Sequence, residues 1–122
     1  MGEMKHYIGQ YSYNGTFKQM KDGSSLLEVS WFTYGGKYYL PTESLRFVMR
    51  KEPDEWISVT DDSVGVREGG ETIDEAIGNA FMMAASNYDD YVAYTGKLTK
   101  GAQEVKDKIQ NWEVYAIDSK AQ

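Results

Sequence analysis

The sequence predicts an α+β fold in which an antiparallel β-meander of about six or seven strands is covered on one face by two C-terminal helices. Three observations lead to this prediction. Residues 1–68 alternate between apolar and polar side chains and are divided by turn-forming residues. A helix-capping sequence follows at residue 72, and apolar residues then recur every three or four positions. The chain has 122 residues, of which 41% are hydrophobic and 14% aromatic, which suits one domain spanning residues 1–122.

Tight turns define the expected strands of the first half. Asn14-Gly15 is a strong hairpin signal because both residues tolerate positive φ, so residues 5–13 and 16–21 are expected to pair. Alternation in the strand at residues 25–34 places four side chains on one face: Leu27, Val29, Trp31 and Thr33. The further turns expected are Asp22-Gly23, Gly35-Gly36, Pro53-Asp54-Glu55 and Asp61-Asp62-Ser63. The further strands expected are residues 37–40, 44–50, 56–60, 64–67 and 112–117.

One of these strands has an alternative. Pro41 followed by polar residues is also compatible with the start of a short helix at residues 44–50. Leu45, Phe47 and Met49 alternate with Arg46, Val48 and Arg50, and this period of two favours the strand.

Two helical stripes follow Gly69-Gly70. Thr72 and Glu75 form a capping box, in which each side chain is expected to accept a hydrogen bond from the other residue's backbone N–H. The first apolar stripe comprises Ile73, Ala76, Ile77, Ala80, Phe81, Ala84 and Tyr88, and it predicts a helix of about five turns. The second comprises Leu98, Ala102, Val105, Ile109 and Trp112. Glu104 and Lys108 are spaced for an i,i+4 ion pair on the second helix.

Composition excludes several classes of protein. The chain has no cysteine and one histidine, His6, so disulfides, thiol nucleophiles and cysteine-ligated metals are excluded. No apolar run approaches the roughly 18 residues that a membrane span requires. The first ten residues lack the apolar segment of a secretory signal, so we expect a cytoplasmic protein without a membrane role.

The net charge of −6 is unevenly distributed. Residues 1–51 carry +3, residues 52–95 carry −10 and residues 96–122 carry +1. This balance disfavours direct nucleic-acid binding, which needs Lys and Arg against phosphates. It suits a basic protein partner, including one that normally holds nucleic acid. A solvated acidic face that keeps the protein soluble is the other interpretation.

The segment VGVREGGETIDEAIGNA, residues 64–80, resembles a stretch of HicB-type antitoxins and of small phage-encoded α+β proteins. The matching residues are Gly70, Glu71, Thr72, Glu75, Ala76 and Ala80. The resemblance covers under a fifth of the chain. It implies a sheet packed on a helix and a small protein that neutralises another protein, such as a phage or mobile-element inhibitor. No functional residue can be transferred from it.

Two functional hypotheses follow. The first is a non-enzymatic protein whose acidic, Tyr-rich surface binds a basic partner. Its expected contact residues are Asp54, Glu55, Asp61, Asp62, Tyr88, Asp89, Asp90 and Tyr91. The second is a homo-oligomeric protein that binds a nucleotide or another anionic metabolite, stacking its base on aromatic side chains. Its expected anion-binding residues are Lys97, Thr99, Lys100, Arg46 and Arg50.

Catalysis has the least support in the sequence. The lone His6 has no partner that spacing can place. The adjacent acidic pairs lack the spacing of a calcium-binding loop, and neighbouring residues of a strand point to opposite faces. We therefore expect no catalytic residue, metal or cofactor.

Overall fold

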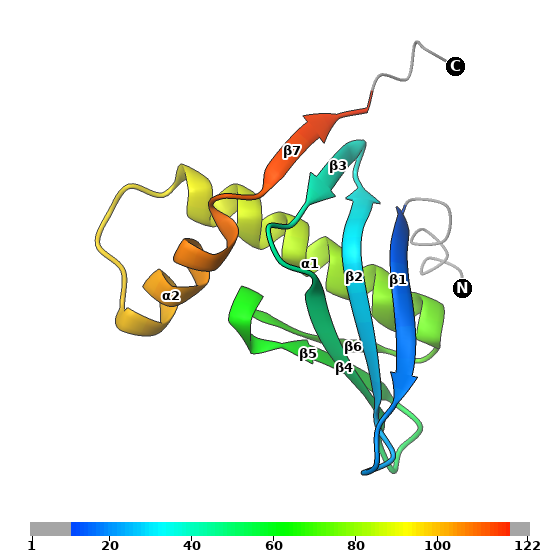
Figure 1. The fold of residues 1–122 in the computed structure, drawn as a ribbon. Coiled ribbons are helices and arrows are strands. Elements are labelled where there is room, and N and C mark those ends of the chain that lie inside the picture. The colour runs from blue at the N-terminus through cyan, green and yellow to red at the C-terminus, as the bar shows by residue number, and fades with distance from the viewer. Residues whose placement is uncertain (1–10, 118–122) are drawn as a thin grey trace.

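A computed structural model describes residues 11–117 as seven antiparallel strands and two α-helices (Figure 1). The predicted fold class is confirmed. The strands are β1 (Tyr11–Gln19), β2 (Ser25–Tyr34), β3 (Lys37–Leu40), β4 (Leu45–Lys51), β5 (Ile57–Asp61), β6 (Val66–Gly70) and β7 (Glu113–Ala116). The helices are α1 (Ile73–Ala93), α2 (Lys100–Ile109) and a 3-10 turn, η2 (Asp62–Val64). His6 and residues 5–10 of the first expected strand lie outside the described residues. Within the described part, neither helix is long and apolar enough to cross a membrane.

The sheet branches at β2. One edge of β2 pairs with β1 along its whole length. The other edge pairs with β4 at residues 25–29 and with β3 at residues 32–34. β3 and β4 therefore follow one another along a single edge, separated by residues 41–44, where Pro41 offers no N–H to continue the ladder. β4 continues to β5 and β6, whereas β3 continues to β7, so two wings diverge from β2 (Figure 1).

The expected hairpin at Asn14-Gly15 is wrong: both residues lie inside β1. They face Trp31 and Val29, so Ser30 of β2 is an extra residue in a β-bulge. Asn14 Nδ2 donates to Ser30 Oγ at 2.8 Å and occupies the bulge. Neither Asn14 nor Gly15 has positive φ, which a type I′ turn would need. Gly15 is required instead by a close approach, because a Cβ there would lie 2.6 Å from the Glu28 carbonyl oxygen.

The bulge also changes which side of β2 is buried. Leu27 and Val29 face the core as expected, but the next buried residue is Phe32. Trp31 lies on the opposite face, stacked on Tyr38 with 5.1 Å between ring centroids. The prediction that Trp31 shares a face with Val29 is therefore wrong, because a single extra residue reverses the alternation.

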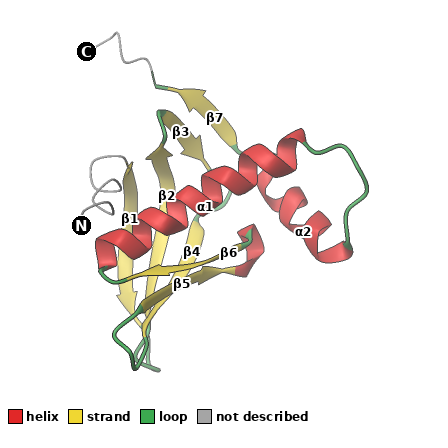
Figure 2. Ribbon diagram, turned by 180° about the vertical axis from the view of Figure 1, so that it is seen from behind, coloured by secondary structure: helices red, strands yellow, loops and turns green. Residues whose placement is uncertain are grey.

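α1 lies across one face of the sheet, as Figure 2 shows, and contributes the centre of the core. The buried residues of its stripe are Ala76, Ile77, Ala80, Phe81, Ala84 and Ala85. The Phe81 ring packs on Phe32 at 4.6 Å and on Tyr11 and Tyr13 at 5.5 and 5.3 Å between ring centroids. These two tyrosines therefore serve the core. Ile73, predicted to belong to the stripe, is 53% exposed at the first residue of α1.

The cap of α1 differs from the expected box in one bond. Thr72 Oγ1 accepts from the Glu75 N–H at 3.1 Å, as predicted. Glu75 Oε1 accepts from the N–H of Glu71 at 2.6 Å, one residue before the donor that the box requires. The first bond satisfies an N–H of the first helical turn, and the second ties Glu75 to the residue before the N-cap.

α2 packs against η2 and α1, and its apolar stripe delivers Ile109 and Trp112 to the core. The expected Glu104–Lys108 pair does not form. Lys108 Nζ instead donates to Glu43 Oε1 at 2.5 Å, across to the segment between β3 and β4. The contact joins the end of α2 to the point where the sheet branches.

Candidate functional site

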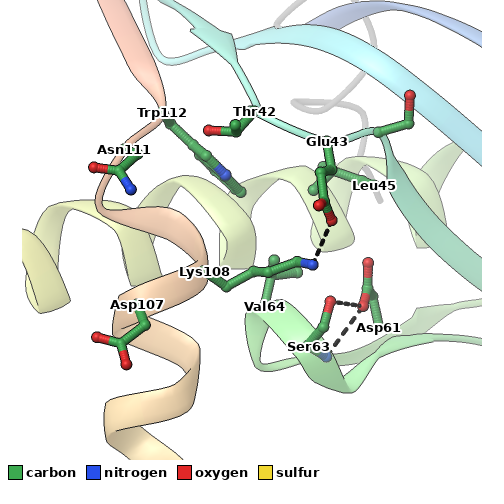
Figure 3. Close-up of a pocket in the computed structure, with 11 residues that line it drawn as sticks. Thr42, Glu43, Leu45, Asp61, Ser63, Val64, Asp107, Lys108, Asn111 and Trp112 are labelled. Atoms are coloured by element: carbon green, nitrogen blue, oxygen red, sulfur yellow. Dashed lines mark hydrogen bonds and ion pairs between the residues drawn. The ribbon is translucent and has the colours of Figure 1, made fainter.

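The branch point of the sheet encloses a small pocket, which we call the seam pocket (Figure 3). Its volume is about 170 Å³. Its walls come from residues 42–45, from η2 and the residue before it, and from the C-terminal end of α2 with Asn111 and Trp112. Among its charged groups, Glu43 and Lys108 pair across the opening, and this hydrogen bond lowers the pKa of the Glu43 carboxyl.

Asp61, a predicted contact residue, holds the seam pocket together. Its Oδ1 accepts from the Ser63 N–H at 3.1 Å and from Ser63 Oγ at 2.7 Å, which caps η2. Its Oδ2 accepts from the Arg46 N–H at 3.0 Å and fixes the start of β4. The structure thus joins residues from both functional hypotheses, Asp61 and Arg46, in one bond. The acceptors of Asp61 are used within the fold.

A wider groove, about 560 Å³ in volume, lies beside the seam pocket on the face of the sheet opposite α1. Leu26 and Val48 supply apolar lining, and Arg46 and Asp62 lie among the charged groups.

Each arginine of the chain forms an ion pair with a carboxylate. The pairs are Arg46 with Glu28, Arg50 with Asp22 at 3.2 Å, and Arg67 with Asp62 at 2.9 and 3.1 Å.

The acidic residues expected at one surface occupy separate places. Asp54 and Glu55 lie in the turn before β5, whereas Asp61 is the last residue of β5 and Asp62 follows it, at the other end of a five-residue strand about 16 Å long. Asp54 Oδ1 accepts from the Trp56 N–H at 3.0 Å, and Glu55 pairs with Lys51 at 2.9 Å.

The C-terminal half of α1 carries the other four predicted contact residues. Tyr88 is half-buried and stacks on Trp112 with 5.9 Å between ring centroids, so its ring belongs to the core. Asp89 lies 3.6 Å from Lys37 Nζ. Asp90 and Tyr91 line an open groove of about 290 Å³ with Asn87, Tyr94 and Leu98. We call it the α1 groove.

The residues expected to bind an anion do not gather at one place. Lys97, Thr99 and Lys100 lie in the α1–α2 loop and at the start of α2, whereas Arg46 and Arg50 lie on β4 (Figure 1). Thr99 Oγ1 accepts from the Ala102 N–H at 3.2 Å and caps α2. No lysine, threonine or arginine of this set lines the α1 groove.

The predicted contact residues include Asp90 and Tyr91 but no other residue of the α1 groove, although the sequence contains a signal for more of it. Asn87, Asp90, Tyr91 and Tyr94 have the spacing i, i+3, i+4 and i+7 that aligns side chains along one side of a helix. Only the loop residue Leu98 needs the structure to be placed. Among residues 11–117, no group of three acidic or histidine side chains is arranged to hold a metal ion.

Comparison with known proteins finds no family model, curated protein or solved structure that matches this chain.

Proposed function

We propose that the protein is a non-enzymatic binding protein that docks an acidic surface, with Asp62, Asp89 and Asp90 among its exposed carboxylates, on a basic protein partner. The pairing of charges carries this proposal. All three arginines are held by carboxylates of the same chain, whereas α1 contains four acidic residues and no basic one. The arginines are therefore not free to bind anionic groups, and the net charge of −6 favours a positive partner surface.

Two of the acidic residues of α1 lie where the helix dipole does not favour them, although Asp89 has an ion-pair partner in Lys37. Asp89 and Asp90 are near the C-terminal end of the helix, where the helix dipole is negative and each carboxylate costs a few tenths of a kcal/mol. Lys106 Nζ donates to the Tyr94 carbonyl oxygen at 2.7 Å and offsets part of that cost. Charges that oppose local stability are typical of functional positions.

A partner that handles nucleic acid fits this chemistry best. Such a protein presents Lys and Arg to phosphates, and an acidic protein surface can occupy the same groups. The resemblance of residues 64–80 to antitoxins supports the same proposal: a phage or mobile-element inhibitor of a nucleic-acid-handling protein. The segment forms β6, a turn and the first part of α1.

The test compares two variants of equal charge. D62N/D89N/D90N removes three exposed carboxylates of the proposed surface, and E104Q/D107N/E113Q removes three exposed carboxylates elsewhere. Each variant changes the net charge from −6 to −3. Asp61 is left intact because it caps η2. The readout is native mass spectrometry of tagged protein recovered from its host lysate, repeated at rising salt.

We expect wild type and E104Q/D107N/E113Q to retain one basic protein in fixed ratio, and D62N/D89N/D90N to lose it. Retention should weaken with salt because exposed charges are screened. Equal retention by all three proteins would contradict the proposal. Equal loss of the partner from both triple variants would also contradict the proposal, because the effect would then depend on net charge and not on these three positions.

A further inference from the structure

The α1 groove has the composition of a site for a cationic side chain. Its lining combines two aromatic rings, Tyr91 and Tyr94, with the carboxylate of Asp90 and the amide of Asn87. No basic side chain from residues 11–117 lines it. Within residues 11–117, the Asp90 carboxylate takes part in no hydrogen bond or ion pair, in contrast to Asp61, Asp62 and Asp89.

The polar groups of the groove are positioned by the fold. Asn87 Nδ2 donates to the carbonyl oxygens of Val64 and Gly65 at 2.9 and 3.0 Å, which fixes the amide plane. The Asn87 Oδ1 atom accepts no hydrogen bond from a described residue. One turn further along α1, Asp90 adds two carboxylate oxygens to the same side of the helix. Asn87 and Asp90 therefore supply amide and carboxylate acceptors to the groove, and the tyrosine hydroxyls are the side-chain donors left beside them.

The aromatic wall is also held in place. The Tyr94 N–H donates to the Asp90 carbonyl oxygen at 3.1 Å, and Lys106 Nζ donates to the Tyr94 carbonyl oxygen. Gly96 lies directly on the Tyr94 ring, since a Cβ at Gly96 would be 2.5 Å from Tyr94 Oη. A residue with any side chain at position 96 would move the ring.

We infer that the α1 groove binds an arginine side chain of the protein partner. This inference rests on the proposed function and names the group that its surface recognises. A guanidinium group can donate two parallel hydrogen bonds to the Asp90 carboxylate and stack its flat face on a tyrosine ring. The ammonium group of a lysine can pair with the carboxylate, but it has no flat face to stack on a tyrosine ring. The charge of the groove and its aromatic wall together select arginine over lysine.

The test uses a blocked triarginine peptide as the probe, with trilysine and tricitrulline peptides as comparisons. Binding to isotope-labelled wild-type protein is followed by NMR titration in about 0.15 M salt, where charges are screened beyond about 8 Å. D90N removes the groove carboxylate. D74N is the matched control, because Asp74 lies on the same helix sixteen residues earlier, about 24 Å away. G96A perturbs the Tyr94 ring without changing charge.

We expect triarginine to shift the amide signals of residues 87–98 first and most. D90N should weaken binding about fivefold and G96A by a smaller factor, while D74N leaves it unchanged. Trilysine should bind more weakly than triarginine, and tricitrulline should not bind. The inference is overturned if the shifts centre elsewhere, if D90N and D74N have equal effects, or if trilysine binds as tightly as triarginine.

Failure here is distinguishable from failure of the proposed function. If D62N/D89N/D90N loses the captured partner but D90N alone retains it and leaves peptide binding unchanged, the acidic surface is the docking surface and the arginine site is wrong. If D62N/D89N/D90N keeps the partner, the proposed function itself is wrong, whatever the peptides do.

Discussion

Replacing Phe81 with alanine should be among the most damaging single truncations of this protein. Phe81 is fully buried, and its ring lies between 4.6 and 5.7 Å, centroid to centroid, from four other rings. These rings belong to Phe32, Phe47, Tyr11 and Tyr13. The side chain therefore connects α1 to β1, β2 and β4 at once.

The expected cost is about 4.5 kcal/mol. Truncation of a buried Phe to Ala costs about 3–5 kcal/mol through lost burial and the cavity left behind. Four aromatic neighbours place F81A near the upper end, because each ring pair adds roughly 0.5–1.5 kcal/mol beyond burial. For 122 residues, an unfolding entropy of about 2.1 cal/mol/K per residue turns this cost into a fall of about 18 °C in Tm.

The assay is urea and thermal unfolding followed by circular dichroism, with Ile73→Ala as the control. Ile73 belongs to the same sequence stripe as Phe81 but is 53% exposed, so I73A should change stability by no more than about 0.5 kcal/mol. A cost below about 1.5 kcal/mol for F81A, or equal costs for the two variants, would refute the assignment of the buried face of α1.

Three further predictions concern single groups. G69A should displace the Trp56 indole, because a Cβ at Gly69 would lie 2.2 Å from Trp56 Nε1; unchanged tryptophan emission would contradict this. Burial raises the pKa of Tyr39 to about 12, so its contribution to stability should be complete below pH 10 and lost between about pH 10 and 12, which phenolate absorbance alongside unfolding measurements would detect. The hydrogen bonds from Ser24 are the main cause of an Asp22 pKa lowered to about 2. S24A should raise that pKa toward 3.8 in an NMR titration, and the Asp22 contribution, present above pH 3.8, is lost as pH falls toward 2.

The helices were predictable because their signals are local. The apolar spacing after Thr72 and the hydroxyl at its start specify α1 without reference to any distant residue. Ile73 is the exception, since its exposure follows from where the sheet ends beneath the helix. Gly35-Gly36 was likewise predictable as a turn, because both residues adopt the positive φ that tight hairpins favour.

The sheet was less predictable because its pairing is not local. The sequence Asn14-Gly15 is typical of a turn, yet β2 is long enough to pair with β1 on both sides of these two residues. The extra residue Ser30 shows only in the register between strands. The branch after β3 also depends on β7, which arrives more than 70 residues later.

In the candidate site too, the features set by neighbouring residues were predictable and those set by distant residues were not. The turn positions of Asp54 and Asp61 could be predicted, because short acidic side chains bond to backbone N–H groups two residues on. The ion pairs of Arg46 and Arg50 could not, since Glu28 and Asp22 come from β2 and from the turn before it. Together with the Arg67–Asp62 pair, they leave none of the three arginines without a carboxylate partner.

The branched sheet has a consequence for how the protein opens. Among the described residues, β7 pairs with β3 alone, and of its four side chains only Val114 is partly buried against the core. Local unfolding of β7 therefore exposes little apolar surface and should need less free energy than global unfolding. β2 pairs with three strands and cannot separate without dismantling both wings. Amide hydrogens should therefore exchange with solvent early in β7 and last in β2. Two regions of one small domain would then differ in how often their backbone hydrogen bonds open.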